Sequence, residues 1–211
     1  MANVVLQNER CTVYRLQPST DPSAAPTRIT LLDGPLLLMS AGGTLQEEVS
    51  SSTLHAAKGK LHACWDPFQT DEVRLQGVDG TFYAVQVYGC ACIGSRGPEG
   101  LDRGVRTDVG TDLLIENDLV CVWAFEVEVG AACHVHRHVR DYFFLNILAS
   151  DTLALDQNGQ PVPGGVSRQE AGQLTFVHVK GPPFPVHGLI NVGSETFRQF
   201  VVEFKQPLSR L

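Results

Sequence analysis

The sequence lacks any apolar run near the ~20 residues that a membrane-spanning helix needs. The longest candidate, around Pro35 to Met39, is broken by Ser40 and Gly42. The first residues also lack a basic segment followed by an apolar one, so we expect no secretory signal peptide. These two absences predict a cytoplasmic protein without a membrane partner.

Basic residues are scarce. Lys and Arg total 16 against 23 Asp and Glu, which gives a formal net charge of -7. Phosphate binding needs a basic surface, so this balance argues against a nucleic-acid partner. Six cysteines are present, and without a secretory signal we interpret them as reduced thiols.

Helical periodicity is also missing, since no segment longer than two turns repeats its apolar residues every 3.6 positions. The chain instead contains 20 Gly and 12 Pro, which favour a turn-rich β protein. Many short apolar-alternating segments indicate a β-sandwich or barrel. The predicted fold class is therefore all-β.

The clearest expected strands lie in the second half, at 119–129, 174–179 and 197–204. Asp156–Gly159 predicts a hairpin turn and Pro161–Gly165 a second turn. In the first half, 72–76 and 81–88 are predicted to form a hairpin. The glycine-rich segment 94–110 is the best linker candidate, so we expect a β-rich region at 1–110 and a second domain at 111–211.

Three histidines alternate in the string His134-Val135-His136-Arg137-His138. In a strand, side chains at this spacing project from one face. Two neighbouring imidazoles on one face can reach the same ion at about 2.0–2.1 Å. A third ligand must then come from a distant strand. His187 is a candidate, because the prolines just before it force an extended chain.

These residues resemble the two motifs of the cupin superfamily, G(X)5HXH(X)3-4E(X)6G and G(X)5PXG(X)2H(X)3N. The matching positions are Gly130, His136 and His138 in the first motif, and Pro182, His187 and Asn191 in the second. The resemblance covers about residues 112–206. It implies a jelly-roll barrel in the C-terminal half, with His136, His138 and His187 as metal ligands.

The sequence departs from the first motif at the glutamate, whose place is taken by Tyr142 or Phe143. What remains resembles the three-histidine cupins, which keep a metal without that glutamate. An alternative register uses His134 and His136 with Asp141 as the acid. In the preferred register, His134 would be an inward group at the barrel mouth that contacts substrate or supports the ligands, and Tyr142 would donate a hydrogen bond to substrate.

The resemblance implies a mononuclear metal enzyme with one divalent transition metal per chain. Iron(II) is preferred, because three-histidine cupins include several iron dioxygenases, and zinc, nickel, manganese or copper are the alternatives. The expected activity is that of an oxygenase on a small anionic or chelating substrate. The alternatives are a non-catalytic small-molecule-binding cupin and a metal-dependent hydrolase, isomerase or lyase.

The first half of the chain has strand signals but no HXH motif, since His55 and His62 are seven residues apart. We interpret it as a degenerate second cupin unit, with an N-terminal arm that augments the sheet as the alternative. Cupins often pair through sheet edges, so a homodimer is expected.

Overall fold

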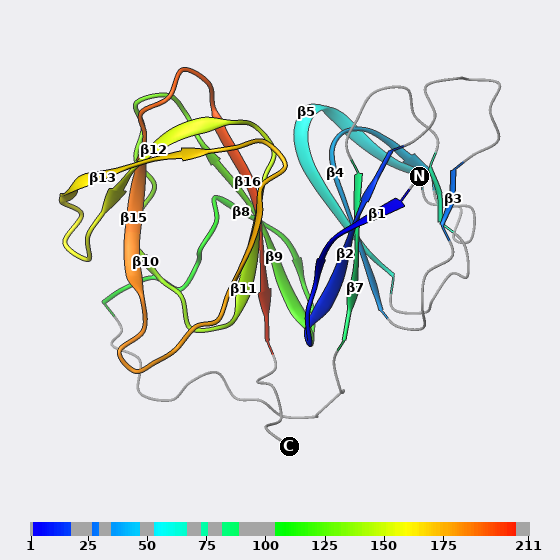
Figure 1. Cartoon of the computed structure of the whole chain (residues 1–211), viewed down its shortest axis with the longest axis horizontal. Coiled ribbons are helices and arrows are strands. Elements are labelled where there is room, and N and C mark those ends of the chain that lie inside the picture. The colour runs from blue at the N-terminus through cyan, green and yellow to red at the C-terminus, as the bar shows by residue number, and fades with distance from the viewer. Residues whose placement is uncertain are drawn as a thin grey trace. The chain divides into compact units, whose positions relative to one another are not determined.

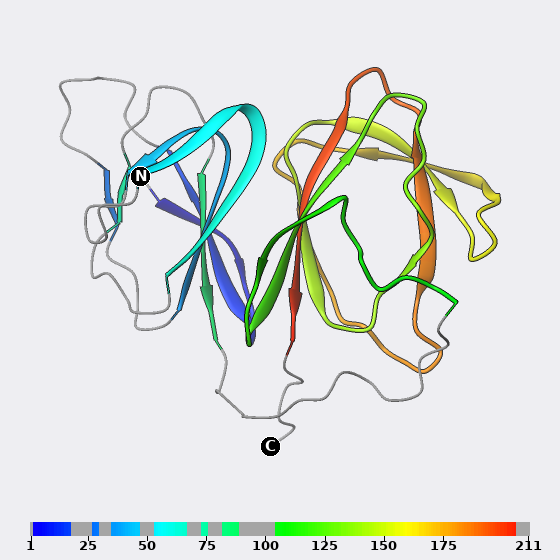
Figure 2. The same ribbon diagram turned by 180° about the vertical axis from the view of Figure 1, so that it is seen from behind.

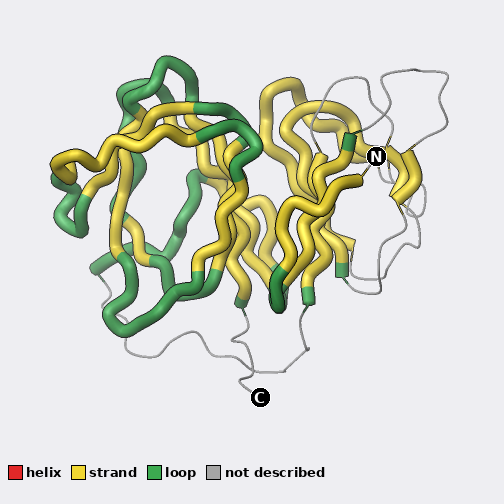
Figure 3. The backbone as a smooth tube through the Cα atoms, viewed as in Figure 1, coloured by secondary structure: helices red, strands yellow, loops and turns green. Residues whose placement is uncertain are grey.

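A computed structural model describes residues 2–17, 27–29, 35–46, 53–66, 73–75, 82–88 and 104–205. Every regular element in this part of the chain is a β-strand, as Figure 3 shows by its colouring. No helix in these ranges is long and apolar enough to cross a membrane. Most of the expected linker at 94–110 falls outside the described residues.

The chain divides into two compact units, Met1–Cys90 and Ala91–Leu211. In the first unit, five antiparallel strands form one sheet in the order β1-β2-β7-β4-β5, and β3 pairs with β6. The strands are β1 (Ala2–Gln7), β2 (Cys11–Leu16), β3 (Thr27–Ile29), β4 (Leu36–Gln46), β5 (Thr53–Asp66), β6 (Val73–Leu75) and β7 (Phe82–Val87). The N-terminal region is thus β-rich, and its origin as a degenerate cupin stays a prediction.

The hairpin predicted between 72–76 and 81–88 is wrong. β7 pairs with β2 on one side and with β4 on the other, while β6 pairs with β3. All six residues of β7 are buried, as expected for a central strand covered on both faces. Because both edges of β7 are occupied by longer partners, its nearest neighbour in sequence cannot pair with it.

The second unit contains two sheets that face each other, and Figures 1 and 2 show them as opposed layers. One sheet has the order β10-β15-β12-β13, and the other has the order β14-β11-β16-β9-β8. The strands are β8 (Asp112–Glu116), β9 (Val120–Val127), β10 (His136–Arg137), β11 (Tyr142–Asn146), β12 (Ser150–Leu155), β13 (Pro161–Gln169), β14 (Leu174–Val177), β15 (Val186–Asn191) and β16 (Phe197–Phe204).

The turn at Asp156–Gly159 joins β12 to β13, as predicted. Asp156 Oδ1 accepts the backbone N–H of Asn158 and of Gln160, and Gly159 has a φ of 75°. The turn expected at 161–165 is wrong, because these residues already belong to β13. β13 lies at the edge of its sheet, where proline and glycine are tolerated since one side needs no partner.

The core of this unit lies between the two sheets. Along β16, every second side chain faces inward, and the same holds for β9 and β11. The buried hydrophobic cluster on this inner side consists of Val109, Phe125, Val127, Cys133, Tyr142, Phe197 and Val201. This cluster forms the wall against which the predicted site residues pack.

Gly110 should be intolerant of any side chain. A Cβ there would lie 2.4 Å from Trp123 Cβ and 2.7 Å from the Ala124 carbonyl oxygen, and neither atom can move without its strand. We expect Gly110→Ala to lower the free energy of unfolding by about 1–3 kcal/mol through overpacking. Urea unfolding followed by fluorescence measures this change.

Gly188→Ala is the matched control, because the nearest atom to its added Cβ is 3.4 Å away, an ordinary contact. We expect its midpoint to stay close to that of the wild type. Equal losses in both variants would contradict the close approach at Gly110.

Candidate metal centre

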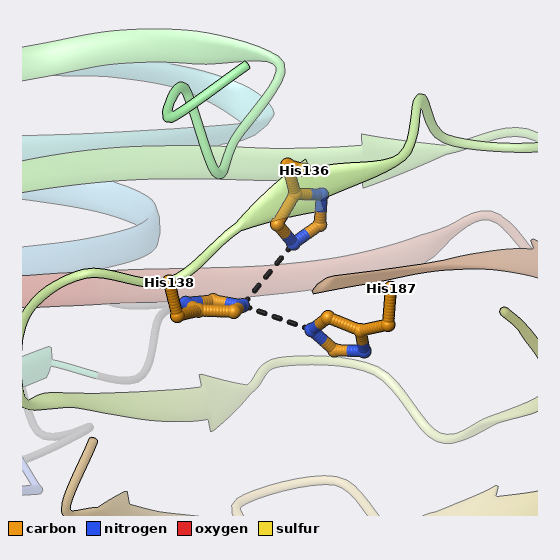
Figure 4. A group of neighbouring side chains, drawn as sticks. All are labelled: His136, His138 and His187. Atoms are coloured by element: carbon orange, nitrogen blue, oxygen red, sulfur yellow. Dashed lines mark hydrogen bonds between the residues drawn. The ribbon is translucent and has the colours of Figure 1, made fainter. Parts of the chain in front are cut away.

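Three imidazoles converge between the sheets of the second unit. His136 lies on β10, His138 follows two residues later, and His187 lies on β15. His138 Nε2 is 3.2 Å from His136 Nε2 and 2.9 Å from His187 Nε2. Figure 4 shows the three rings pointing toward one another, with dashed lines that join His138 to each of the other two. The structure therefore brings together the three histidines that the motif spacing in the sequence predicts as a group.

Pairing between distant segments places these rings. β10 runs antiparallel to β15, with His136 directly opposite His187. The backbone N–H of Arg137 donates to the Arg106 carbonyl at 2.8 Å, and that of His138 donates to the Pro185 carbonyl at 3.0 Å. These bonds keep the chain extended beyond the two residues of β10, so His136 and His138 face the same side.

Hydrogen bonding fixes the tautomer of His136. Its Nδ1 is 3.1 Å from the His134 carbonyl oxygen, which can only accept, so Nδ1 carries the proton. The Nε2 of a neutral His136 is then a bare lone pair that points at the other two rings. A backbone carbonyl behind a ring nitrogen is the usual way in which a metal-binding histidine is oriented.

Burial keeps the rings neutral. Desolvation, with help from the neighbouring histidines, lowers the pKa of His136 to about 4 and that of His138 to about 2. Desolvation also lowers the pKa of His187. At neutral pH all three offer lone pairs, the form that binds a metal ion.

The residues present fit a transition-metal ion. Two ligand nitrogens at about 2.1 Å from one ion lie about 3.0 Å apart at a right angle and about 3.4 Å apart at a tetrahedral angle. The two Nε2 separations of 3.2 and 2.9 Å fall in and just below this range. Nδ1 of His138 is buried and has no hydrogen-bond partner among the described residues, so these residues leave its Nε2 able to present a lone pair. The group could therefore hold a metal ion.

Tyr142 lies beside the cluster, and its ring stacks on that of His138 with centroids 4.1 Å apart and planes 13° apart. Burial, and then the charge of Glu203, raise the pKa of Tyr142 to about 12, so its hydroxyl stays protonated. Phe143 points to the other face of the strand and is fully buried. Neither position where the family has glutamate places a carboxylate at the histidines.

Asp141 lies apart from this cluster, and His134 meets only its edge, with its ring centroid 5.7 Å from that of His136. His134 Nε2 donates to the Asp108 carbonyl at 2.8 Å, and its side chain is not among those that line the cavity described below. The carboxylate of Asp141 accepts the Val179 N–H at 2.9 Å and lies 3.5 Å from His178 Nδ1. The alternative register with His134, His136 and Asp141 is therefore not assembled in the described structure.

The histidines open into a cavity of about 190 Å³. Four aromatic rings line it, those of Phe125, Tyr142, Phe144 and Phe197. Its polar lining beyond the histidines and Tyr142 consists of Thr152, Ser167, Gln169 and Gln199. No aspartate, glutamate, lysine or arginine is among the described lining residues.

Sequence reasoning missed these polar lining residues. Gln199 could have been found from the alternation of 197–204, because positions 197, 199, 201 and 203 share the inward face. The sequence gives no comparable alternation that would place the hydroxyls of Thr152 and Ser167 in the cavity, since a turn is predicted where β13 begins.

No family model and no curated protein matches the chain. Among solved structures, AerE from Microcystis aeruginosa is similar over 97% of both chains at 10% identity, with a TM-score of 0.53. A cupin 2 conserved barrel domain protein from Leptotrichia buccalis covers 97% of this chain and 88% of its own, with 11% identity and a TM-score of 0.48. A cupin domain from Bordetella pertussis covers 45% of this chain and 91% of its own, with 23% identity and a TM-score of 0.37.

These likenesses concern the fold alone. The fold is the all-β, double-stranded β-helix of the cupin proteins, and its second unit contains a three-histidine group that could hold a metal ion.

The metal-free protein should lose stability as the pH falls below about 6.5. The ordinary pKa of histidine is 6.5, while His136 in the folded chain has a pKa of about 4. Between these values the unfolded chain binds a proton that the folded chain does not, so acid favours unfolding. The contribution of the neutral rings to the free energy of unfolding is complete above pH 6.5. It falls by about a few kcal/mol as the pH drops from 6.5 toward 4.

Urea unfolding at pH 7.5, 6 and 5 with a chelator present measures this loss. His136→Gln should reduce the pH dependence, because His138 and His187 still contribute, whereas His178→Gln, whose side chain is 55% exposed, should leave it unchanged. The same slope in the wild type and His136→Gln would refute the assignment.

Proposed function

We propose that the second unit contains a mononuclear metal centre in which His136, His138 and His187 supply the ligands. The observation that carries this proposal is the convergence of three Nε2 atoms, 3.2 and 2.9 Å apart, from segments about 50 residues apart in the chain, with His136 and His138 buried and His187 exposed. Two neutral imidazoles can form one N–H···N hydrogen bond between them. When three rings meet at one point, one such hydrogen bond leaves the third nitrogen lone pair without a donor. A cation resolves this conflict, because every lone pair can then point at it.

The proposed ion is one divalent transition metal per chain. Imidazole binds zinc, copper, iron and nickel, so the donor set alone does not select among them. Iron(II) is our first choice, because the three-histidine cupins that the sequence resembles include iron dioxygenases. Zinc, nickel, manganese and copper are the alternatives.

The proposed activity is that of a dioxygenase on a small chelating or anionic substrate. A bound iron(II) supplies Lewis acidity toward the chelating group and redox chemistry toward dioxygen. Both oxygen atoms of dioxygen enter the product, so the reaction needs no further reductant. The chain itself supplies three imidazole ligands and a cavity lined largely by aromatic rings.

The aromatic wall gives a planar substrate flat surfaces to pack against. Phe125 packs edge-on against both His136 and Phe197, with ring centroids 6.3 and 5.9 Å apart. Tyr142 covers one face of His138, and its hydroxyl makes no hydrogen bond to the described residues. Because this hydroxyl stays protonated, it can donate to an oxygen of a substrate bound beside the histidines.

A non-catalytic metal-dependent binding protein is the second candidate. The lining favours it over a hydrolase, isomerase or lyase, because the described lining residues include no carboxylate or amine that could act as a general base. Oxygen uptake by the iron-loaded protein with β-diketones, catechols or thiol acids separates the oxygenase from the binding protein. A homodimer and a cytoplasmic location stay predictions.

Protein purified without a histidine tag should contain close to one transition-metal ion per chain by elemental analysis. His136→Ala should abolish the bound metal, because two remaining imidazoles leave one coordination direction without a ligand. His178→Ala is the control, since His178 belongs to the same unit but is exposed and lies beside Asp141. Equal metal content in both variants would disprove the ligand assignment.

Tyr142→Phe should keep the metal and slow turnover. Phenylalanine preserves the stack on His138 and removes only the hydroxyl, so metal content should match the wild type. We expect oxygen uptake to fall on the order of ten- to hundredfold, as for the loss of one hydrogen-bond donor in a dry site.

Tyr14→Phe, on β2 of the first unit, serves as the control and should leave the rate unchanged. An unaltered rate in Tyr142→Phe would remove the tyrosine from the mechanism.

A further inference from the structure

The cavity has a second polar region, which the proposed metal centre does not use. Thr152 on β12, Ser167 and Gln169 on β13, and Gln199 on β16 all line the cavity. Thr152 pairs across the sheet with Asn191, which lies four residues along β15 from His187. These side chains therefore gather away from the ring cluster.

An apolar belt separates the two polar regions. On β11, Tyr142 lies beside the histidines and Asn146 lies opposite Gln199, about 13 Å further along the strand at about 3.3 Å per residue. Phe144 projects inward between them. Phe125 on β9 spans the distance between the two polar regions. Its ring contacts that of His136, while the backbone of Phe125 pairs with that of Gln199.

A chain of hydrogen bonds fixes the direction of every amide at this second end. Gln199 Nε2 donates to Asn146 Oδ1 at 2.7 Å, and Asn146 Nδ2 donates to Gln169 Oε1 at 3.2 Å. Gln169 Nε2 then donates to Ser167 Oγ at 2.9 Å, whose hydroxyl is 3.3 Å from Thr152 Oγ1. Asn146 is fully buried and does not line the cavity, so it acts as a positioning residue for Gln199.

These hydrogen bonds leave two polar groups of Gln199 available to a ligand. The side chain is 9% exposed and belongs to the cavity wall. One of its N–H groups is used by Asn146, while its Oε1 and its second N–H make no hydrogen bond to the described residues. A buried amide with an open acceptor and an open donor in a cavity wall is suited to a ligand group that both donates and accepts.

We propose that Gln199, together with Thr152 and Ser167, forms a second subsite that selects ligands whose far end carries an uncharged hydroxyl or carboxamide. Charged far ends are disfavoured, because the described lining offers no counter-charge, and because Gln199 and Thr152 are buried, where an unpaired charge is costly; Ser167 lies on the exposed side of the subsite. The subsite rests on the proposed function, since the near end of the ligand is taken to chelate the metal.

The size of the cavity matches such a ligand. An apolar cavity of about 150 Å³ admits benzene. The present cavity of about 190 Å³ therefore has room for one ring with small substituents. The ligand class is a single planar ring with a chelating pair of oxygens at one end and a neutral polar substituent at the other.

The test uses three catechols that share the chelating end and differ at position 4. These are 4-methylcatechol, 3,4-dihydroxybenzyl alcohol and 3,4-dihydroxybenzoic acid. Their Kd values are measured by anaerobic calorimetry with the zinc-loaded full chain, because zinc is redox-inert and permits no turnover. Zinc content is measured first, by elemental analysis.

We expect the benzyl alcohol to bind on the order of five- to tenfold more tightly than 4-methylcatechol, as one or two hydrogen bonds provide. Gln199→Met keeps the shape and should reduce this ratio to about one, with zinc content and the Kd of 4-methylcatechol unchanged. Thr152→Val, a second and independent variant, should also lower the ratio. Gln160→Met, in the exposed turn before β13, is the matched control.

Each other outcome counts against the subsite. A ratio near one in the wild type, a ratio that survives Gln199→Met, or no catechol binding to zinc-loaded protein overturns it while leaving the metal centre intact. Tighter binding of the benzoic acid than of the alcohol overturns the preference for an uncharged group. Failure to retain zinc overturns the metal centre, and the subsite with it.

Discussion

The burial of two neutral imidazoles, those of His136 and His138, beside a third from His187 is the constraint on which the second unit depends. His136 and His138 are each 3% exposed, and burial holds both rings in the uncharged form. Their Nε2 atoms face one another rather than a protein acceptor, an arrangement that is costly unless another group satisfies the lone pairs. The aromatic wall strengthens the constraint, since its rings offer no hydrogen-bond partner to these lone pairs.

Long-range strand pairing creates this arrangement. β10 contains only two residues and would not persist alone, but Arg106 and Pro185 bind its backbone from both sides. The pairing of β10 with β15 then sets His136 opposite His187. All these contacts belong to residues 104–205, so the site is built from the second unit alone. Its geometry is a property of the folded sheet pair and not of the HXH string.

The parts of the fold that could be predicted are those with strict two-residue alternation. The strand at 197–204 has the predicted bounds, and the spacing of His136 and His138 places both rings on one side. His134 lies before the strand, which starts only at His136, and it is not among the residues that line the cavity, so its expected role stays a prediction. The first-half hairpin failed because burial of both faces of β7 outweighs its closeness in sequence to β6. The amide chain from Gln199 to Thr152 joins four strands, and no local pattern encodes such a path.

The charge-free lining has a consequence for the solution around the protein. With three neutral ligands and no acidic side chain in the described wall, a bound dication would keep its whole charge. Electroneutrality at the centre would then be completed by whatever anion enters from solvent. Phosphate, carbonate and carboxylate buffers thereby become competitors of the natural ligand. The apparent affinity for the natural ligand would then depend on the choice of buffer.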